Sequence, residues 1–157
     1  MRGNVQSRQQ ELRPDYKYEN KKVAKFINYI MIGGEKERTR TLVYDAFDII
    51  EDEMDVDDPT DVFIDALENV GPQMEVRSRR IGGANYQVPY EVSPDRQVQL
   101  AMRWIINIAR GQEGTPMAEA LAAELMEAAK GEGKAVAKKE QSHKMAEANK
   151  AFAHFAQ

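Results

Sequence analysis

Apolar residues spaced three and four positions apart recur along most of this 157-residue chain, and glycines or prolines interrupt them. Such spacing lets a helix bury one stripe of its surface, so the pattern predicts a bundle of short helices. The interruptions are those that end or begin helices: paired glycines, and a proline preceded by Asp, Ser or Thr. We expect six helices, at about 21–32, 36–55, 59–70, 94–110, 116–129 and 135–155.

One segment departs from the helical spacing. Between Glu75 and Val92, polar and apolar side chains alternate as they do in strands, on either side of Gly82-Gly83. A glycine pair permits a tight reversal of the chain, and Pro89 suits an edge strand. We therefore predict an antiparallel β-hairpin at about 73–92. Because two strands alone are only marginally stable in water, the hairpin must lie on the helices or protrude toward a partner.

The length fits one domain, and a content of 42% hydrophobic and 31% charged residues is typical of globular proteins. Residues 1–19 lack a helical period and contain Pro14, which predicts an extended N-terminal arm before a mainly α domain at 20–157. The chain has no cysteine, no secretion signal and no apolar run near the roughly 20 residues of a membrane span. We expect a soluble cytoplasmic protein without a membrane partner.

Charge is unevenly distributed along the chain, although the net value is only −4. The stretch 41–76 holds 12 acidic residues and no Lys or Arg, whereas the rest of the chain carries 22 basic and 14 acidic residues. A polyanion responds to the local potential within about a Debye length, so the net charge does not exclude nucleic-acid binding. The acidic flank also suits a helical protein-interaction adaptor, which is the alternative function.

The fourth predicted helix carries an arginine stripe. Arg96, Arg103 and Arg110 are seven residues apart, and with Gln99 and Asn107 they lie opposite the apolar face, with no acid beside them on the helix. Arginine forks match phosphate geometry, but a simple solvated face explains the stripe equally well. Comparable basic positions occur on the first and last predicted helices: Lys21, Lys22, Lys25, Lys139, His143 and Lys150.

The predicted hairpin adds Arg77, Arg79 and Arg80 on its first strand. Together with the basic helix faces, these residues form a distributed footprint of the kind used in recognising RNA shape. Tyr86, Tyr90 and Trp104 have the rings needed to stack on bases. For Trp104 we favour packing against the core, and for Tyr86 both roles stay open.

Catalysis has little support in the sequence. His143 and His154 are the only histidines, and neither has a carboxylate or thiol at metal-ligand spacing. No nucleophile, base and acid stand in a recognisable order, and the glycine pairs lack the pattern of a phosphate loop. Carboxylates such as Asp48 and Asp52 indicate a solvated face rather than a hydrolase. We expect no enzymatic activity, cofactor, metal or small-molecule substrate.

Three strings carry a resemblance: RSRRIGGANYQVPYEV, LAMRWIINIAR and HKMAEANKAFAHF. With LRPDYKY, VAKFINYIM and ALENVGPQMEV, they resemble the family of bacterial small-subunit ribosomal protein number seven. The resemblance runs in the same order from Leu12 to Phe155. Members of that family are usually basic throughout, whereas this chain carries an acidic stretch and a sparsely basic N-terminus.

The resemblance implies a helical domain with a protruding β-hairpin that binds the 3′ major domain of small-subunit ribosomal RNA and nucleates assembly of the subunit head. It also implies that the hairpin lies at the exit site, near tRNA and mRNA, and that neighbouring head proteins, including small-subunit protein number eleven, are partners. On this basis the ribosomal-RNA-binding residues are Arg2, Arg8, Lys21, Lys22, Lys25, Lys36, Arg96, Arg103, Arg110, Lys134, Lys138, Lys139, His143, Lys144 and Lys150. The hairpin residues expected near tRNA and mRNA are Arg77, Arg79, Arg80, Asn85, Tyr86 and Gln87.

Overall fold

The computed structural model describes residues 11–157. Helices make up most of the fold, and a two-stranded antiparallel sheet follows the third helix. In chain order the elements are α1 (Lys21–Ile30), α2 (Lys36–Met54), α3 (Pro59–Val70), β1 (Met74–Ile81), β2 (Ala84–Glu91), α4 (Pro94–Arg110), α5 (Met117–Ala129), α6 (Gly133–Ala148) and the 3₁₀ helix η1 (Lys150–Ala156). The mainly α class with one hairpin is therefore confirmed.

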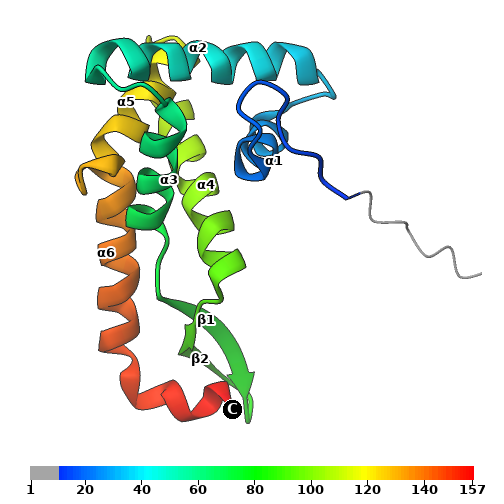
Figure 1. The fold of residues 1–157 in the computed structure, drawn as a ribbon. Coiled ribbons are helices and arrows are strands. Elements are labelled where there is room, and N and C mark those ends of the chain that lie inside the picture. The colour runs from blue at the N-terminus through cyan, green and yellow to red at the C-terminus, as the bar shows by residue number, and fades with distance from the viewer. Residues whose placement is uncertain (1–10) are drawn as a thin grey trace, which may run out of the picture.

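The prediction of six helices is wrong by one, because the last predicted helix divides in two and the described residues contain seven. α6 ends at Ala148, and the Asn149 side chain donates a 2.8 Å hydrogen bond to the carbonyl oxygen of Met145. η1 then runs in a new direction toward the hairpin (Figure 1). The turn brings Phe152 and Phe155 against Tyr86, whereas a straight continuation of α6 would lead both rings away from the hairpin.

Side-chain caps fix where several helices begin. The Asn20 side chain accepts hydrogen bonds from the first turn of α1, and Asp58 accepts a 2.9 Å bond from the first turn of α3. Ser93 caps α4 in the same way, and Pro59 and Pro94 occupy the first positions of their helices. A proline lacks the N–H that a first-turn position leaves unpaired, so both helices start where the sequence predicts.

α5 is the central helix and packs against α2, α3, α4 and α6. Beside it, Phe26, Phe47 and Phe63 join the first three helices through a fully buried cluster. The ring centre of Phe63 lies 4.9 Å from that of Phe26 and 5.5 Å from that of Phe47. Burial of these rings holds the helical body together.

The junction of α5 and α6 depends on a buried carboxylate. Glu124 is only 2% exposed, and its side chain accepts a 3.0 Å hydrogen bond from the backbone N–H of Ala135 in the first turn of α6. Burial raises the pKa of Glu124. Gly133 begins α6 with φ of +91°, and a Cβ at this position would lie 2.7 Å from a carboxylate oxygen of Glu127. A larger residue at position 133 would therefore disturb the junction.

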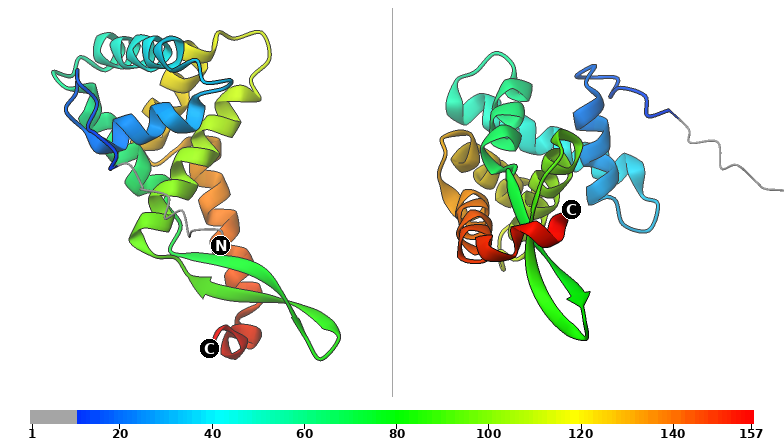
Figure 2. Two further views of the ribbon diagram at one scale, coloured as in Figure 1. Left: turned by 90° about the vertical axis from the view of Figure 1, so that its right-hand side faces the viewer. Right: turned by 90° about the horizontal axis from the view of Figure 1, so that it is seen from below.

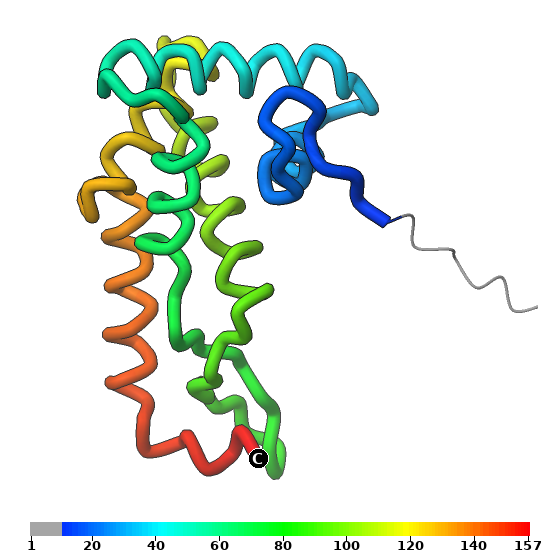
Figure 3. The backbone as a smooth tube through the Cα atoms, viewed as in Figure 1, coloured from blue at the N-terminus to red at the C-terminus, as the bar shows by residue number. Residues whose placement is uncertain are grey.

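α2 lies across one end of the molecule and the hairpin lies at the other, with α3, α4 and α6 running between them (Figure 1). Two further views show that the hairpin projects beyond the helices (Figure 2). The chain trace shows that the C-terminal segment turns back beside the hairpin (Figure 3). Within the described residues, the hairpin thus has two neighbours that are far from it in sequence, α6 at its root and η1 beyond the root.

Part of the predicted arm is fixed on α2. The Asp15 side chain is 1% exposed and accepts hydrogen bonds from the backbone N–H groups of Lys17 and Tyr18, both at 3.0 Å, and from the Tyr44 hydroxyl at 2.6 Å. Burial and the hydrogen bond to Asp15 raise the pKa of Tyr44. These bonds attach the segment around Asp15 to the helical body. Residues 1–10 of the predicted arm lie outside the described part of the chain.

Candidate nucleic-acid interface

Cations from two helices meet where α1 packs on α4. The Nζ atom of Lys25 lies 5.8 Å, and the guanidinium carbon of Arg103 5.6 Å, from the centre of the Tyr29 ring. Farther along α4, Arg110 donates a 2.8 Å hydrogen bond to the carbonyl oxygen of Ile30. We call Lys25, Tyr29, Arg103 and Arg110 the α1–α4 seam. Within residues 11–157, its cations form no ion pair with a carboxylate, so their charge is available to an anion.

The basic residues of α6 and η1 differ in their surroundings. The Nζ atom of Lys138 lies 5.3 Å from the Trp104 ring, and Trp104 packs half-buried against the core, as expected. Lys139 and Lys150 each pair with a nearby glutamate, at 3.5 and 3.0 Å. In the described part of the chain, the exposed predicted lysines without an ion pair are Lys22, Lys36, Lys134, Lys138 and Lys144.

His143 contacts the root of the hairpin. Its Nε2 atom accepts a 3.0 Å hydrogen bond from the backbone N–H of Gln73, and the hydroxyl of the adjacent Ser142 donates a 2.9 Å bond to the carbonyl oxygen of Met74. These two bonds attach α6 to the start of β1. The basic stripe did not reveal this role, because Gln73 is distant in the sequence.

An acid does reach the arginine stripe, contrary to the expectation from the helix alone. Glu75 of β1 places one carboxylate oxygen 3.4 Å from the Arg96 guanidinium and pairs through the other with Arg77. Burial by itself raises the pKa of Glu75, but hydrogen bonds and positive charge from Arg77 and Arg96 outweigh it and hold the pKa below its ordinary value. Arg77 and Arg96 therefore join the hairpin to α4, and their charge is partly neutralised.

The strand register divides the hairpin side chains between two faces. Arg79 pairs with Tyr86, and Arg80 with Asn85. Because successive strand residues point to opposite sides, these two pairs lie on opposite faces. The inner face, which contacts η1, includes Arg77, Arg79 and Tyr86, and the outer face includes the exposed residues Ser78, Arg80, Asn85 and Gln87. The six predicted hairpin residues thus split evenly between the two faces.

The turn between the strands projects farthest from the body. Gly82 and Gly83 form it with φ of +58° and +83°, and a Cβ at either position would meet nothing within 4 Å. The left-handed backbone, and not crowding, is therefore what favours glycine at these two positions.

A polar groove lies beside the N-terminal segment. Arg13, Lys21, Asn28 and Lys36 line it, and the Lys21 Nζ atom lies 3.7 Å from the exposed carboxylate of Glu11. The sequence reasoning did not include Arg13, since no spacing pattern marks a residue in this segment. Arg2 and Arg8, which the resemblance assigned to RNA binding, lie outside the described residues.

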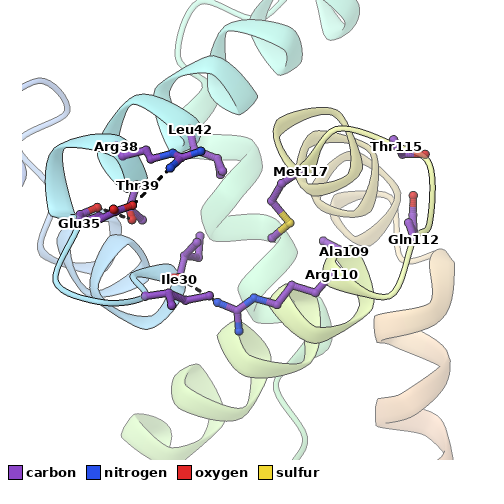
Figure 4. A pocket seen from close by; sticks show the side chains of 11 residues that line it. Ile30, Glu35, Arg38, Thr39, Leu42, Ala109, Arg110, Gln112, Thr115 and Met117 are labelled. Carbon is purple, nitrogen blue, oxygen red and sulfur yellow. Dashed lines mark hydrogen bonds and ion pairs between the residues drawn. The ribbon is translucent and has the colours of Figure 1, made fainter.

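A second feature absent from the sequence reasoning is an apolar cavity of about 440 Å³ between α1, α2, α4 and α5. Ile30, Leu42, Ala109 and Met117 point into it, and Arg110 closes one side through its bond to Ile30 (Figure 4). Residues from four separate segments form this cavity, so no local sequence pattern could predict it. Its lining contains no arrangement of groups suited to catalysis.

The acidic residues of 41–76 lie mainly on exposed surfaces of α2 and α3. Asp48 pairs with Lys17 at 3.8 Å, and Asp52 is exposed. Among residues 11–157, His, Cys, Asp and Glu form no cluster able to hold a metal ion. In the same part of the chain, no helix has the length and apolar character needed to cross a membrane.

A helical body, a projecting basic hairpin and cations without carboxylate partners together define a protein of the RNA-binding class. The sequence matches the family Ribosomal protein S7p/S5e over residues 1–150. This chain belongs to that family.

Curated relatives agree over nearly the whole chain, and each is named Small ribosomal subunit protein uS7. The relative from Carboxydothermus hydrogenoformans is 54% identical over 154 residues, covering 98% of this chain and 97% of its own. The relative from Sorangium cellulosum is 54% identical over 142 residues and 90% of each chain. The relative from Salinibacter ruber is 49% identical over 155 residues and 99% of each chain.

Family membership confirms the coarse predictions. The chain is a small-subunit ribosomal protein that binds small-subunit ribosomal RNA on the cytoplasmic ribosome and takes part in translation. The family is structural and not enzymatic, which also removes the hydrolase reading of Asp48 and Asp52.

Proposed function

We propose that this protein binds the 3′ major domain of small-subunit ribosomal RNA directly, nucleates assembly of the subunit head and presents its hairpin at the exit site near tRNA and mRNA. Small-subunit protein number eleven is the proposed neighbour across that site. Family membership and the resemblance of the hairpin string support this placement.

The α1–α4 seam is the observation that carries the RNA-binding part of the proposal. Lys25 and Arg103 come from different helices and share one aromatic ring, so packing of the body fixes the distance between their charges. Cations held in a fixed arrangement displace counterions from phosphates without losing much side-chain freedom. The seam therefore suits a structured RNA whose phosphates lie in a defined geometry.

The predicted RNA-binding residues contribute unequally in this proposal. We assign direct phosphate contacts first to cations without a carboxylate partner: Lys22, Lys25, Lys36, Arg103, Arg110, Lys134, Lys138 and Lys144. Lys21, Arg96, Lys139 and Lys150 are paired with acids, and His143 bonds to the backbone, so each must give up or share a contact to bind RNA. Their contribution to affinity is smaller for that reason.

The alternative of an adaptor that acts through the acidic flank has less support. The acidic side chains of α2 and α3 are exposed, as on any solvated face, and no contact in the described residues singles out a partner. We therefore keep the acidic surface outside the proposed RNA interface.

The test uses a transcript of the 3′ major domain and the full-length protein, with affinity measured by filter binding at several salt concentrations. We expect the affinity to fall steeply with salt, with a log–log slope of about −0.7 to −0.9 for each phosphate contact. Arg103→Ala is expected to weaken binding about tenfold and to reduce the slope by roughly one contact.

Arg38→Ala is the matched control, because Arg38 is 85% exposed on α2 and is paired with Glu35 at 3.5 Å. This variant should bind like the parent protein. An affinity that does not depend on salt, or equal losses for Arg103→Ala and Arg38→Ala, would overturn the proposal.

A further inference from the structure

The C-terminal 3₁₀ helix contacts the hairpin through a cluster of aromatic rings. The ring centre of Tyr86 lies 5.3 Å from that of Phe152 and 5.0 Å from that of Phe155, and the two phenylalanines are stacked at 6.2 Å. η1 contacts β2, and it crosses the hairpin in the right-hand view of Figure 2. Tyr86 is in β2, in the half of the hairpin nearer the turn, so η1 contacts the hairpin well beyond its root.

A polar contact accompanies the rings. The guanidinium of Arg79, directly across the strands from Tyr86, donates a hydrogen bond to the carbonyl oxygen of Phe155. The same face of the hairpin thus offers η1 one ring and one cation. Nearer the root, Ser142 and His143 of α6 bond to Met74 and Gln73.

An isolated two-stranded ribbon is marginal in water, and ordering it during binding costs conformational entropy. Beyond its root, the hairpin of this protein has η1 as its neighbour in the described residues, because the remaining helices stop short of the turn (Figure 2). The contacts to η1 are therefore well placed to limit how far the hairpin swings before any RNA is present.

We propose that η1 is a brace that fixes the direction of the hairpin in the free protein, with Phe152 and Phe155 as positioning residues. The brace occupies the inner face, and the outer face, with Ser78, Arg80, Asn85 and Gln87, is left to contact tRNA or mRNA. The second statement rests on the proposed exit-site function, whereas the brace itself does not.

Arg79 and Arg80 form a natural matched pair for this proposal. They are adjacent on β1 and chemically identical, and both side chains are exposed, but they lie on opposite faces. Arg79 is bonded to Phe155, whereas Arg80 has no hydrogen bond or ion pair among the described residues. Arg79 is assigned to positioning the hairpin and Arg80 to contacting nucleic acid.

The brace is tested by measuring a distance in the full-length free protein. The chain has no cysteine, so Ala84→Cys near the hairpin turn and Ala137→Cys on α6, both exposed, accept a pair of spin labels without background. We expect a single narrow distance distribution in the labelled parent. It should broaden in the double variant Phe152→Ala, Phe155→Ala and stay narrow in the conservative variant Phe152→Tyr, Phe155→Tyr.

In the same assay Arg79→Ala should broaden the distribution to a smaller extent, and Arg80→Ala should leave it unchanged. Far-UV circular dichroism of each variant checks that the helical body is intact. A narrow distribution in the double alanine variant would overturn the brace.

The outer face is tested with ribosomes reconstituted from each variant, by timing the release of deacylated tRNA from the exit site. Arg80→Ala is expected to speed release about fivefold, as for the loss of one hydrogen-bonded contact. The double alanine variant should also speed release, because the hairpin must then be ordered on binding.

The two proposals fail in different ways. If the double alanine variant broadens the distribution but neither it nor Arg80→Ala alters tRNA release, the brace stands and the exit-site placement is wrong. If Arg79→Ala speeds release while the distribution stays narrow, the assignment of the two faces is wrong.

Discussion

The helical body and the hairpin differ in what holds them in place. In the body, Phe26, Phe47 and Phe63 are fully buried and α5 contacts four other helices. In the hairpin, the strands bond to each other, and the rest of the attachment consists of a few polar bonds at the root and one aromatic cluster with η1. Val88 of β2 is fully buried, and the adjacent Pro89 is buried as well.

Because of this difference, the stability of the folded protein and the direction of its hairpin depend on separate sets of contacts. Burial of apolar area dominates folding free energy, so the body can fold whatever the hairpin does. Polar bonds and a small ring cluster contribute little to global stability, but they set where the hairpin points. Variants in the body should therefore change the free energy of unfolding, whereas variants at the hairpin contacts should mainly change the position and mobility of the hairpin.

The largest expected effect is on the body. Phe63→Ala should lower the free energy of unfolding by about 3–5 kcal/mol, because it leaves a cavity between two other buried rings. Urea denaturation followed by circular dichroism measures the loss. Ile32→Ala is the control, since Ile32 is 71% exposed and its truncation should change stability by no more than about 0.5 kcal/mol. The comparison breaks down if Phe152→Ala is as destabilising as Phe63→Ala.

An intermediate effect is expected at the root of the hairpin. His143→Ala removes the acceptor for the Gln73 N–H and should reduce stability by about 1 kcal/mol. Hydrogen exchange measured by NMR should show faster exchange of the backbone N–H of Gln73 in this variant. Lys144→Ala, a change at the exposed neighbouring residue, should leave that amide unaffected. Weaker RNA binding with an unchanged Gln73 amide would mean that His143 serves the RNA interface and not the root.

The smallest expected effect is the change in folding stability with pH that comes from Glu75. Glu75 has a pKa below its ordinary 4.5 in the folded protein, so near and below that pH the unfolded chain binds more protons. The stabilisation from Glu75 is therefore present above about pH 4.5 and is lost as the pH falls through the folded pKa.

Glu75→Gln should remove this part of the pH dependence, lowering stability at pH 7 by less than about 1 kcal/mol and by less still in acid. Urea denaturation of the parent and the variant at pH 7, and again at a pH below the folded pKa of Glu75, measures the loss of stability under each condition. Glu91→Gln on β2 is the control, because Glu91 is exposed and has no ion pair in the described residues. Equal losses at both pH values for Glu75→Gln would show that its ion pairs with Arg77 and Arg96 are not the cause.

Local sequence signals predicted most of the fold. Asp58-Pro59 and Ser93-Pro94 marked the starts of α3 and α4, and the alternation around Gly82-Gly83 marked the hairpin. These signals work because caps, first-turn prolines and glycine turns depend on neighbours within a few residues. The break at Asn149 was missed, because the contacts that follow it, from Phe152 and Phe155 to Tyr86, join residues that are far apart in the sequence.

The sequence indicated which cations belong to the candidate site, but it did not indicate which side chains of the protein those cations contact. The spacing of Arg96, Arg103 and Arg110 placed them on one side of α4, and that is where the structure has them. The spacing gave no sign that Glu75 pairs with Arg96 while Arg103 shares a ring with Lys25. The three arginines therefore differ in how much charge they offer to RNA.

By itself, the sequence determined the helical class, the hairpin and its turn, the separation of acidic from basic segments and the membership of a ribosomal family. Each of these depends on patterns within a segment or on the likeness of long strings. Only the tertiary structure decided which cations are neutralised, which hairpin face is covered and where the chain turns after α6. Those outcomes depend on side chains that meet across long sequence separations, and such meetings are set by how the helices pack.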